Sequence, residues 1–96
     1  MLLVAHPDDE LLWFGGLLPT YAGDRHLAVE VVYAVPATPV RRLELLDGLW
    51  TCGVTAYPEL LHMRDARSDT LEGQYKKWSK TAFYDKVTDA IRRYRP

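Results

Sequence analysis

Short apolar runs alternate with helical patterns along this chain of 96 residues. Three of the runs are typical of buried strands, at residues 1–5, 27–35 and 59–63. Helical spacing of apolar side chains predicts helices at 10–22, 40–52 and 83–94. Alternating strands and helices favour a parallel sheet with right-handed crossovers. We therefore expect an α/β, Rossmann-like, three-layer fold with the second strand central and the strand order 3-2-1.

The helical segments carry their own boundary signals. Pro19 predicts that the first helix ends or kinks near Leu18. The pair Gly15-Gly16 costs roughly 1 kcal/mol per residue against alanine inside a helix, which favours close packing on the sheet. Gly53 stands where a C-terminal cap of the second helix belongs.

The apolar faces of the later helices can also be assigned from spacing. The second helix should bury Leu43, Leu46, Leu49 and Trp50. The last helix should bury Phe83, Val87, Ala90, Ile91 and Tyr94. Residues 64–80 are polar, and we expect them to be irregular although Leu71, Tyr75 and Trp78 have helical spacing.

Composition limits the class of protein. The formal net charge of −1 gives no reason to expect nucleic acid or an anionic membrane as partner. The short basic and aromatic stretch at 76–80 is better explained as a surface helix. Cys52 is the only cysteine, which suits a reducing compartment, and no segment approaches the ~20 apolar residues of a membrane span. We expect a single cytoplasmic domain over 1–96.

A cluster of polar side chains follows the first strand directly. His6, Asp8 and Asp9 should lie beyond the carboxyl end of that strand, where open α/β sheets carry their sites. Histidine and aspartate bind zinc, and a spare carboxylate beside a metal can act as a base. The alternative is that one aspartate merely caps the first helix, and Glu10 should do no more than favour the helix dipole.

The run His6-Pro7-Asp8-Asp9-Glu10 resembles the signature of the PIG-L/LmbE-like deacetylases, zinc enzymes that remove N-acetyl groups from glucosamine conjugates. Weaker likenesses follow at Gly15-Gly16, Arg41-x-x-Glu44, Cys52-Gly53-Val54 and the ending Arg92–Pro96. Family members run well past this length. We therefore expect the chain to be the N-terminal part of such a domain.

The resemblance implies roles for individual residues. His6 and Asp9 would be zinc ligands, Asp8 the general base, and the third ligand a histidine beyond residue 96. We expect His26 to be a surface residue and His62 a residue of the sheet rather than a ligand.

Two further residues are candidates for contacts with a substrate. Arg41 begins the second helix near the predicted site and could hold a phosphate or a sugar hydroxyl. A solvated helix start, or a pair with Glu44, explains it equally well. Asp65 follows the third strand and could bind sugar hydroxyls, although a solvated loop explains it too.

The expected function is zinc-dependent hydrolysis of the N-acetyl group of an N-acetylglucosamine-type conjugate. By itself the chain should be inactive, and it should self-associate through the exposed first strand. The alternatives are a non-catalytic Rossmann-like module for a sugar or nucleotide, and an inert structural piece. The chain has no Gly-x-Gly-x-x-Gly motif after the first strand, which counts against the first of these alternatives.

Overall fold

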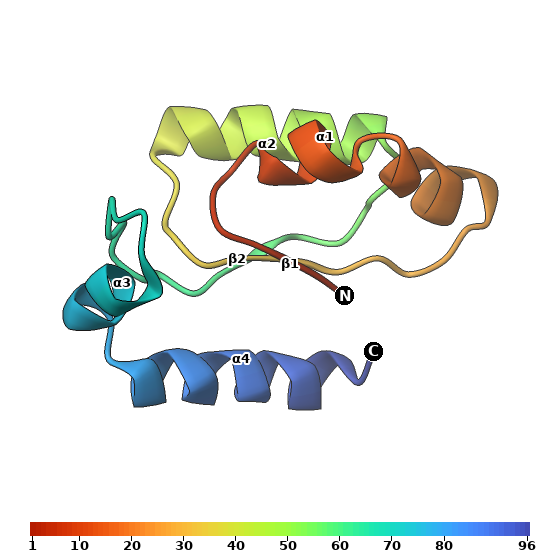
Figure 1. Cartoon of the computed structure of the whole chain (residues 1–96). Helices are drawn as coiled ribbons and strands as arrows, with labels where there is room; N and C mark the ends of the chain where they lie inside the picture. The colour runs from red at the N-terminus through yellow and green to blue at the C-terminus, as the bar shows by residue number, and fades with distance from the viewer.

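The structure is a computed structural model that describes residues 1–96 (Figure 1). Its strands are β1 (Leu2–Val4), β2 (Val31–Tyr33) and β3 (Glu59–Leu60). Its helices are α1 (Asp9–Phe14), the π-helical η1 (Pro19–Asp24), α2 (Pro39–Thr51), α3 (Leu71–Lys77) and α4 (Lys80–Tyr94). No helix combines the length and apolar character needed to cross a bilayer.

The three strands form one parallel sheet. Leu2 pairs with Val31 across β1 and β2, and Tyr33 pairs with Leu60 across β2 and β3. The order is β1-β2-β3, where we expected 3-2-1. Both orders place β2 in the centre with β1 and β3 beside it, so the α/β class and the parallel pairing agree with the prediction.

The strands are shorter than the apolar runs that predicted them. Pairing is nevertheless extended by isolated backbone hydrogen bonds, because the Ala34 amide donates to the Val4 carbonyl at 2.9 Å and the Leu61 amide donates to the Tyr33 carbonyl at 2.8 Å. His62 has φ 55°, a left-handed conformation that breaks the regular path of β3. Local backbone geometry thus cuts short the strand predicted over 59–63.

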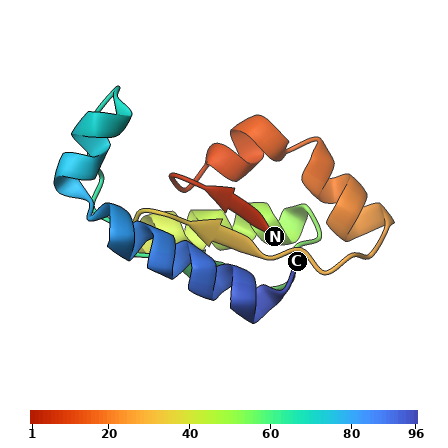
Figure 2. The same ribbon diagram turned by 60° about the horizontal axis from the view of Figure 1, so that its bottom comes forward.

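Both faces of the sheet are covered. Val31 and Tyr33 are buried on one face with Leu45 and Leu49 of α2, whereas Val32 packs on the other face against Ala90 of α4. Side chains alternate between faces along a strand, so consecutive residues of β2 serve two separate cores. Figure 1 shows α1 and α2 on one side of the sheet and α4 on the other, and Figure 2 shows α4 running along the sheet.

The first predicted helix is broken into two pieces. α1 ends at Phe14, a turn follows at Gly15-Gly16, and η1 begins at Pro19. The Arg25 amide donates to the Thr20 carbonyl at 3.0 Å, a five-residue step typical of a π-helix. The glycine pair therefore interrupts the helix, and only the boundary at Pro19 was predicted. The expected close packing of this pair on the sheet is not found, because no atom lies within 4 Å of a Cβ on Gly16 and Gly15 is close only to the Leu11 backbone.

The buried face of α2 differs from the predicted one. Leu45 and Leu49 are buried, but Leu43 is 66% and Trp50 48% exposed. Leu49 and the partly buried Leu46 pack on the core as predicted, so the prediction was wrong for Leu43 and Trp50 and missed Leu45. Where α1 lies against α2, a Cβ on Gly48 would be 2.8 Å from the Leu11 Cδ1, so the Leu11 side chain would have to shift to accommodate a larger residue.

The C-terminal segment contains one more helix than predicted. α3 lies in the segment expected to be irregular, and the Thr70 side chain caps it by accepting from the Gly73 amide at 3.1 Å. α4 packs its predicted face on the sheet except for Ile91, which is 46% exposed. Glu59 of β3 anchors α4, because it accepts hydrogen bonds from Arg93 and Tyr94 at 2.8 Å each.

Gly53 ends α2 as predicted. It has φ 84°, and the amides of Gly53 and Val54 donate to the carbonyls of Trp50 and Leu49 at 2.9 and 3.0 Å, which is a Schellman motif. A Cβ at this position would also lie 3.0 Å from Cα and N of Gly23 in η1.

Gly53→Ala should therefore destabilise the fold. The alanine would be strained at this φ and would collide with the backbone of η1, so we expect a loss of about 1–3 kcal/mol in the free energy of unfolding. Urea denaturation measures the loss. Gly16→Ala is the control, because no atom lies within 4 Å of its Cβ position. Equal stability of Gly53→Ala and the wild type would contradict the argument.

Candidate functional site

The carboxyl ends of the three strands lead into one open, mostly polar cleft of about 650 Å³. The loop after β1 contributes His6, Asp8 and Asp9, the segment after β2 leads to Arg41 in the first turn of α2, and the chain after β3 contributes Asp65. Because all three strands run in the same direction, residues 59 positions apart in sequence meet at the same sheet edge. The cleft therefore contains every residue for which the sequence predicted a role in chemistry or binding.

His6 lies between two carboxylates. Its Nδ1 is 3.7 Å from Asp9 Oδ2, and its Nε2 is 3.6 Å from Asp65 Oδ1. The His6 backbone amide donates to the same Asp9 Oδ2 at 2.8 Å. This bond folds the loop back on itself and fixes the imidazole and the Asp9 carboxylate beside each other.

Asp8 has an unusual backbone conformation. Its φ is 97°, which is rare for any residue with a Cβ and marks a locally strained site. Asp8 stands at the N-cap position of α1, but its side chain caps no helix amide. Instead its carboxylate pairs with the Arg41 guanidinium, and both side chains are about half exposed.

These contacts answer the alternative interpretations of the motif. A capping aspartate accepts a hydrogen bond from the first turn of its helix, and neither Asp8 nor Asp9 does so. The pair of Arg41 with Glu44 is also absent, because Arg41 pairs with Asp8. The interpretation of Asp8 and Asp9 as ordinary helix caps is therefore wrong.

Glu10 is completely buried, although it sits in the first turn of α1. Its Oε2 accepts the Asp8 amide at 3.0 Å. Burial raises the pKa of Glu10, while its backbone and Tyr33 contacts lower it. Burial and the nearby Glu10 raise the pKa of the Tyr33 hydroxyl far above its usual range. Glu10 Oε1 and Tyr33 Oη are both buried, and neither makes a hydrogen bond of normal geometry.

The Asp65 side chain is about half exposed at the rim of the cleft. Its Oδ1 accepts the Arg67 amide at 3.0 Å. This bond, followed by the neighbouring His6, lowers the pKa of the Asp65 carboxyl. Asp65 is therefore held as a carboxylate facing the imidazole, a geometry that suits a hydrogen-bond acceptor for a hydroxyl.

The donor set fits part of a zinc site. Two ligand atoms on a tetrahedral zinc are roughly 3.4 Å apart, for metal–ligand distances of about 2.1 Å. The 3.7 Å between His6 Nδ1 and Asp9 Oδ2 comes close to that spacing. A catalytic zinc takes three protein ligands, and no group of three His, Cys, Asp or Glu side chains in the chain is arranged to hold a metal.

The other histidines lie outside the cleft. His26 is exposed on the loop before β2, as predicted. His62 is exposed just after β3, and it lines a separate hollow with Arg42 and Tyr57. Neither can complete a metal site with His6.

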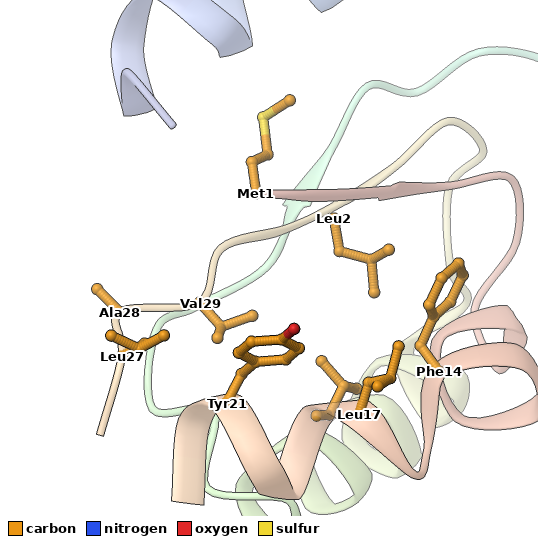
Figure 3. A pocket seen from close by; sticks show the side chains of 9 residues that line it. Met1, Leu2, Phe14, Leu17, Tyr21, Leu27, Ala28 and Val29 are labelled. Carbon is orange, nitrogen blue, oxygen red and sulfur yellow. The ribbon is translucent and has the colours of Figure 1, made fainter. Parts of the chain in front are cut away.

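A second hollow lies at the opposite end of β1 (Figure 3). Its volume is about 300 Å³, and all nine residues that line it are apolar. Leu2, Leu17 and Tyr21 face one another across it. The hollow carries no group capable of catalysis, and it is relevant instead to the exposed edge of the sheet.

Three further residues shape the cleft in ways that were not predicted from the sequence. Thr38 caps α2 by accepting the Arg41 amide at 3.3 Å, which places Arg41 beside Asp8. The Arg67 amide orients Asp65 by donating to its carboxylate, and the buried Glu10 carboxylate accepts the Asp8 amide. The pair Thr38-Pro39 is a recognisable start signal for a helix, so only Thr38 was within reach of sequence reasoning.

Comparison with known proteins returns no match to a family model, to a curated protein or to a solved structure.

Proposed function

We propose that this chain forms part of a zinc-dependent hydrolase that removes the N-acetyl group from an N-acetylglucosamine-type conjugate. The observation that supports the proposal is the meeting of five residues around one cleft: His6, Asp8, Asp9, Arg41 and Asp65. They come from the ends of three strands, and their chemistry matches the roles that the resemblance to PIG-L/LmbE-like deacetylases implies.

His6 and Asp9 are the proposed zinc ligands, because they lie side by side with donor atoms 3.7 Å apart. Zinc supplies a Lewis acid that polarises a carbonyl and favours ionisation of water. The third protein ligand is proposed to lie outside residues 1–96, because the cleft holds no third side chain in position. The cytoplasm remains the proposed compartment of the protein.

Asp8 is the proposed general base. Amide hydrolysis requires removal of a proton from the attacking water and delivery of a proton to the leaving nitrogen. The Asp8 carboxylate faces the cleft, is half exposed, and is oriented by Arg41. A protonated Asp8 can then return the proton to the amine.

Arg41 and Asp65 are proposed to bind the substrate within the same cleft as His6. Arg41 offers guanidinium donors, and Asp65 offers carboxylate acceptors, which together suit the hydroxyls of a sugar. The Asp8–Arg41 pair is exposed to solvent and adds little stability, so Arg41 is free to exchange part of its contact for a substrate.

The proposal is tested by metal analysis and by acetate release from an N-acetylglucosamine conjugate, in a protein that contains this chain and supplies the third ligand. We expect one zinc per chain. His6→Ala and Asp9→Ala should weaken zinc binding by more than the roughly 10–100-fold that loss of an outer-shell partner costs.

The controls are His26→Ala and Asp24→Ala, which alter exposed residues outside the cleft and should leave the zinc affinity unchanged. A folded protein that binds no zinc and releases no acetate would favour the non-catalytic sugar- or nucleotide-binding module. For residues 1–96 alone we expect weak zinc binding and no deacetylation, because two ligands hold zinc poorly.

A further inference from the structure

The buried Glu10 has no role in the chemistry described so far. A carboxylate is rarely fully buried unless it is hydrogen-bonded or paired, because its charged form loses the solvation of water. One of its oxygens has no hydrogen-bond partner, and the other accepts a single amide, that of Asp8. Tyr33 is a further close neighbour of this carboxylate, but the hydrogen bond of normal geometry that the buried side chain makes is with the backbone of Asp8.

We infer that Glu10 is a positioning residue whose buried carboxylate holds Asp8 in its left-handed conformation and so turns the Asp8 carboxylate toward the cleft and Arg41. This inference rests on the proposed role of Asp8 as the base.

The geometry of the turn supports the inference. The amide of an N-cap residue has no partner within its own helix, and in a capping box a glutamate at the third helical position accepts it. Glu10 is at the second helical position, and it reaches the Asp8 amide while φ of Asp8 is 97°. The Asp8 carbonyl is held by the Leu11 and Leu12 amides, and loss of the Glu10 acceptor would remove the only hydrogen bond to the Asp8 amide.

The Asp8 side chain is not used to cap the helix. The Leu11 and Leu12 amides donate to the Asp8 carbonyl, the Asp8 amide donates to Glu10, and the Asp8 carboxylate pairs with Arg41 across the cleft. The Asp9 carboxylate instead accepts the His6 amide. The two adjacent aspartates therefore have different partners, Arg41 for Asp8 and His6 for Asp9.

Hydrogen exchange of the Asp8 amide, followed by NMR in the whole chain without zinc, tests the inference. In the wild type the Asp8 amide should be protected at least about tenfold relative to an unstructured peptide. Glu10→Gln keeps an acceptor oxygen and should retain protection within about threefold. Glu10→Leu keeps the volume but removes the acceptor, and its Asp8 amide should exchange at least about tenfold faster while the amides of α2 are unchanged.

Tyr33→Phe is the matched control, because it removes the buried hydroxyl beside Glu10 and leaves the acceptor for Asp8 in place. It should retain the protection of the Asp8 amide. The inference is overturned if Glu10→Leu keeps that amide protected, or if Tyr33→Phe loses protection to the same extent. If Glu10→Leu does not fold, the wild type still tests the inference, because an unprotected Asp8 amide in the wild type would be enough to overturn it.

Because exchange is measured without zinc, absence of zinc binding would contradict the proposed function and leave this inference standing. In a protein that deacetylates, Glu10→Leu should lower kcat about a hundredfold with zinc retained, and Glu10→Gln should restore most of the rate. A purely structural role would show no such rescue at equal stability. Loss of zinc together with activity in Glu10→Leu would count against positioning of the base.

Discussion

Asp8→Asn should remove most of the hydrolytic activity while zinc stays bound. Asparagine has nearly the same size as aspartate but cannot accept a proton at neutral pH, so the attacking water loses its base. General-base catalysis typically contributes 10²–10⁴-fold, and we expect kcat to fall by about that factor. His6 and Asp9 are unchanged, so the zinc content should match that of the wild type. The assay is acetate release by the zinc-loaded protein that supplies the third ligand.

Asp47→Asn is the matched control for this substitution. Asp47 is exposed on α2 outside the cleft, so the same chemical change there should affect neither rate nor zinc content. The assignment of roles would be reversed if Asp8→Asn removed the metal while Asp9→Asn retained it. Arg41 adds a second check, because Asp8→Asn also removes the charge that faces its guanidinium. Loss of substrate affinity with kcat unchanged would assign Asp8 to binding.

The position of the cleft could be predicted from sequence because it depends on strand direction alone. In a parallel sheet, residues that follow the strands gather at one edge, and His6, Arg41 and Asp65 do so. The relation between their side chains depends on tertiary contacts. Nothing in the local sequence distinguishes an Asp8 paired with Arg41 from one that caps α1, because both begin with an aspartate before a helix.

The burial of Glu10 could not be predicted for the same reason. A glutamate in the first turn of a helix normally faces water and favours the helix dipole, which is the role we expected. Glu10 instead turns inward toward Tyr33, a residue of β2 that is 23 positions away. Only the packing of α1 on the sheet decides this orientation.

Secondary structure was predicted best where a residue acts through its own backbone. Gly53 and Pro19 mark boundaries that the structure has, because glycine adopts the positive φ of a helix C-terminus at little cost and the proline ring fixes its own φ. The buried face of α2 was predicted correctly for Leu46 and Leu49 and wrongly for Leu43, because Leu43 and Leu45 have equal hydropathy and the angle at which α2 meets the sheet selects Leu45. α3 was not predicted, although Leu71, Tyr75 and Trp78 have helical spacing, because the segment is mostly polar; the Thr70 side chain caps the helix, and Leu71 is exposed.

Residues 1–96 alone should self-associate through β1. β1 is an edge strand of the sheet, and its inward hydrogen bonds are made by Leu2 and Val4. Since backbone groups alternate in direction along a strand, those of Leu3 point away from β2 and have no neighbouring strand. Leu3 is also 38% exposed, and the apolar hollow of Figure 3 lies beside the same strand. An unpaired apolar edge favours pairing with the same edge of a second copy.

Leu3→Lys tests this expectation, because a charged side chain on an edge strand opposes pairing with another chain. We expect sedimentation velocity and light scattering to show oligomers of the wild type at about 100 µM, and the dissociation constant of Leu3→Lys to rise at least tenfold, roughly 1.4 kcal/mol. Leu43→Lys is the control, because Leu43 is 66% exposed on α2, away from the sheet edge. A monomeric wild type would refute self-association, and an equal effect of both lysines would show that general surface hydrophobicity, rather than the β1 edge, brings the chains together.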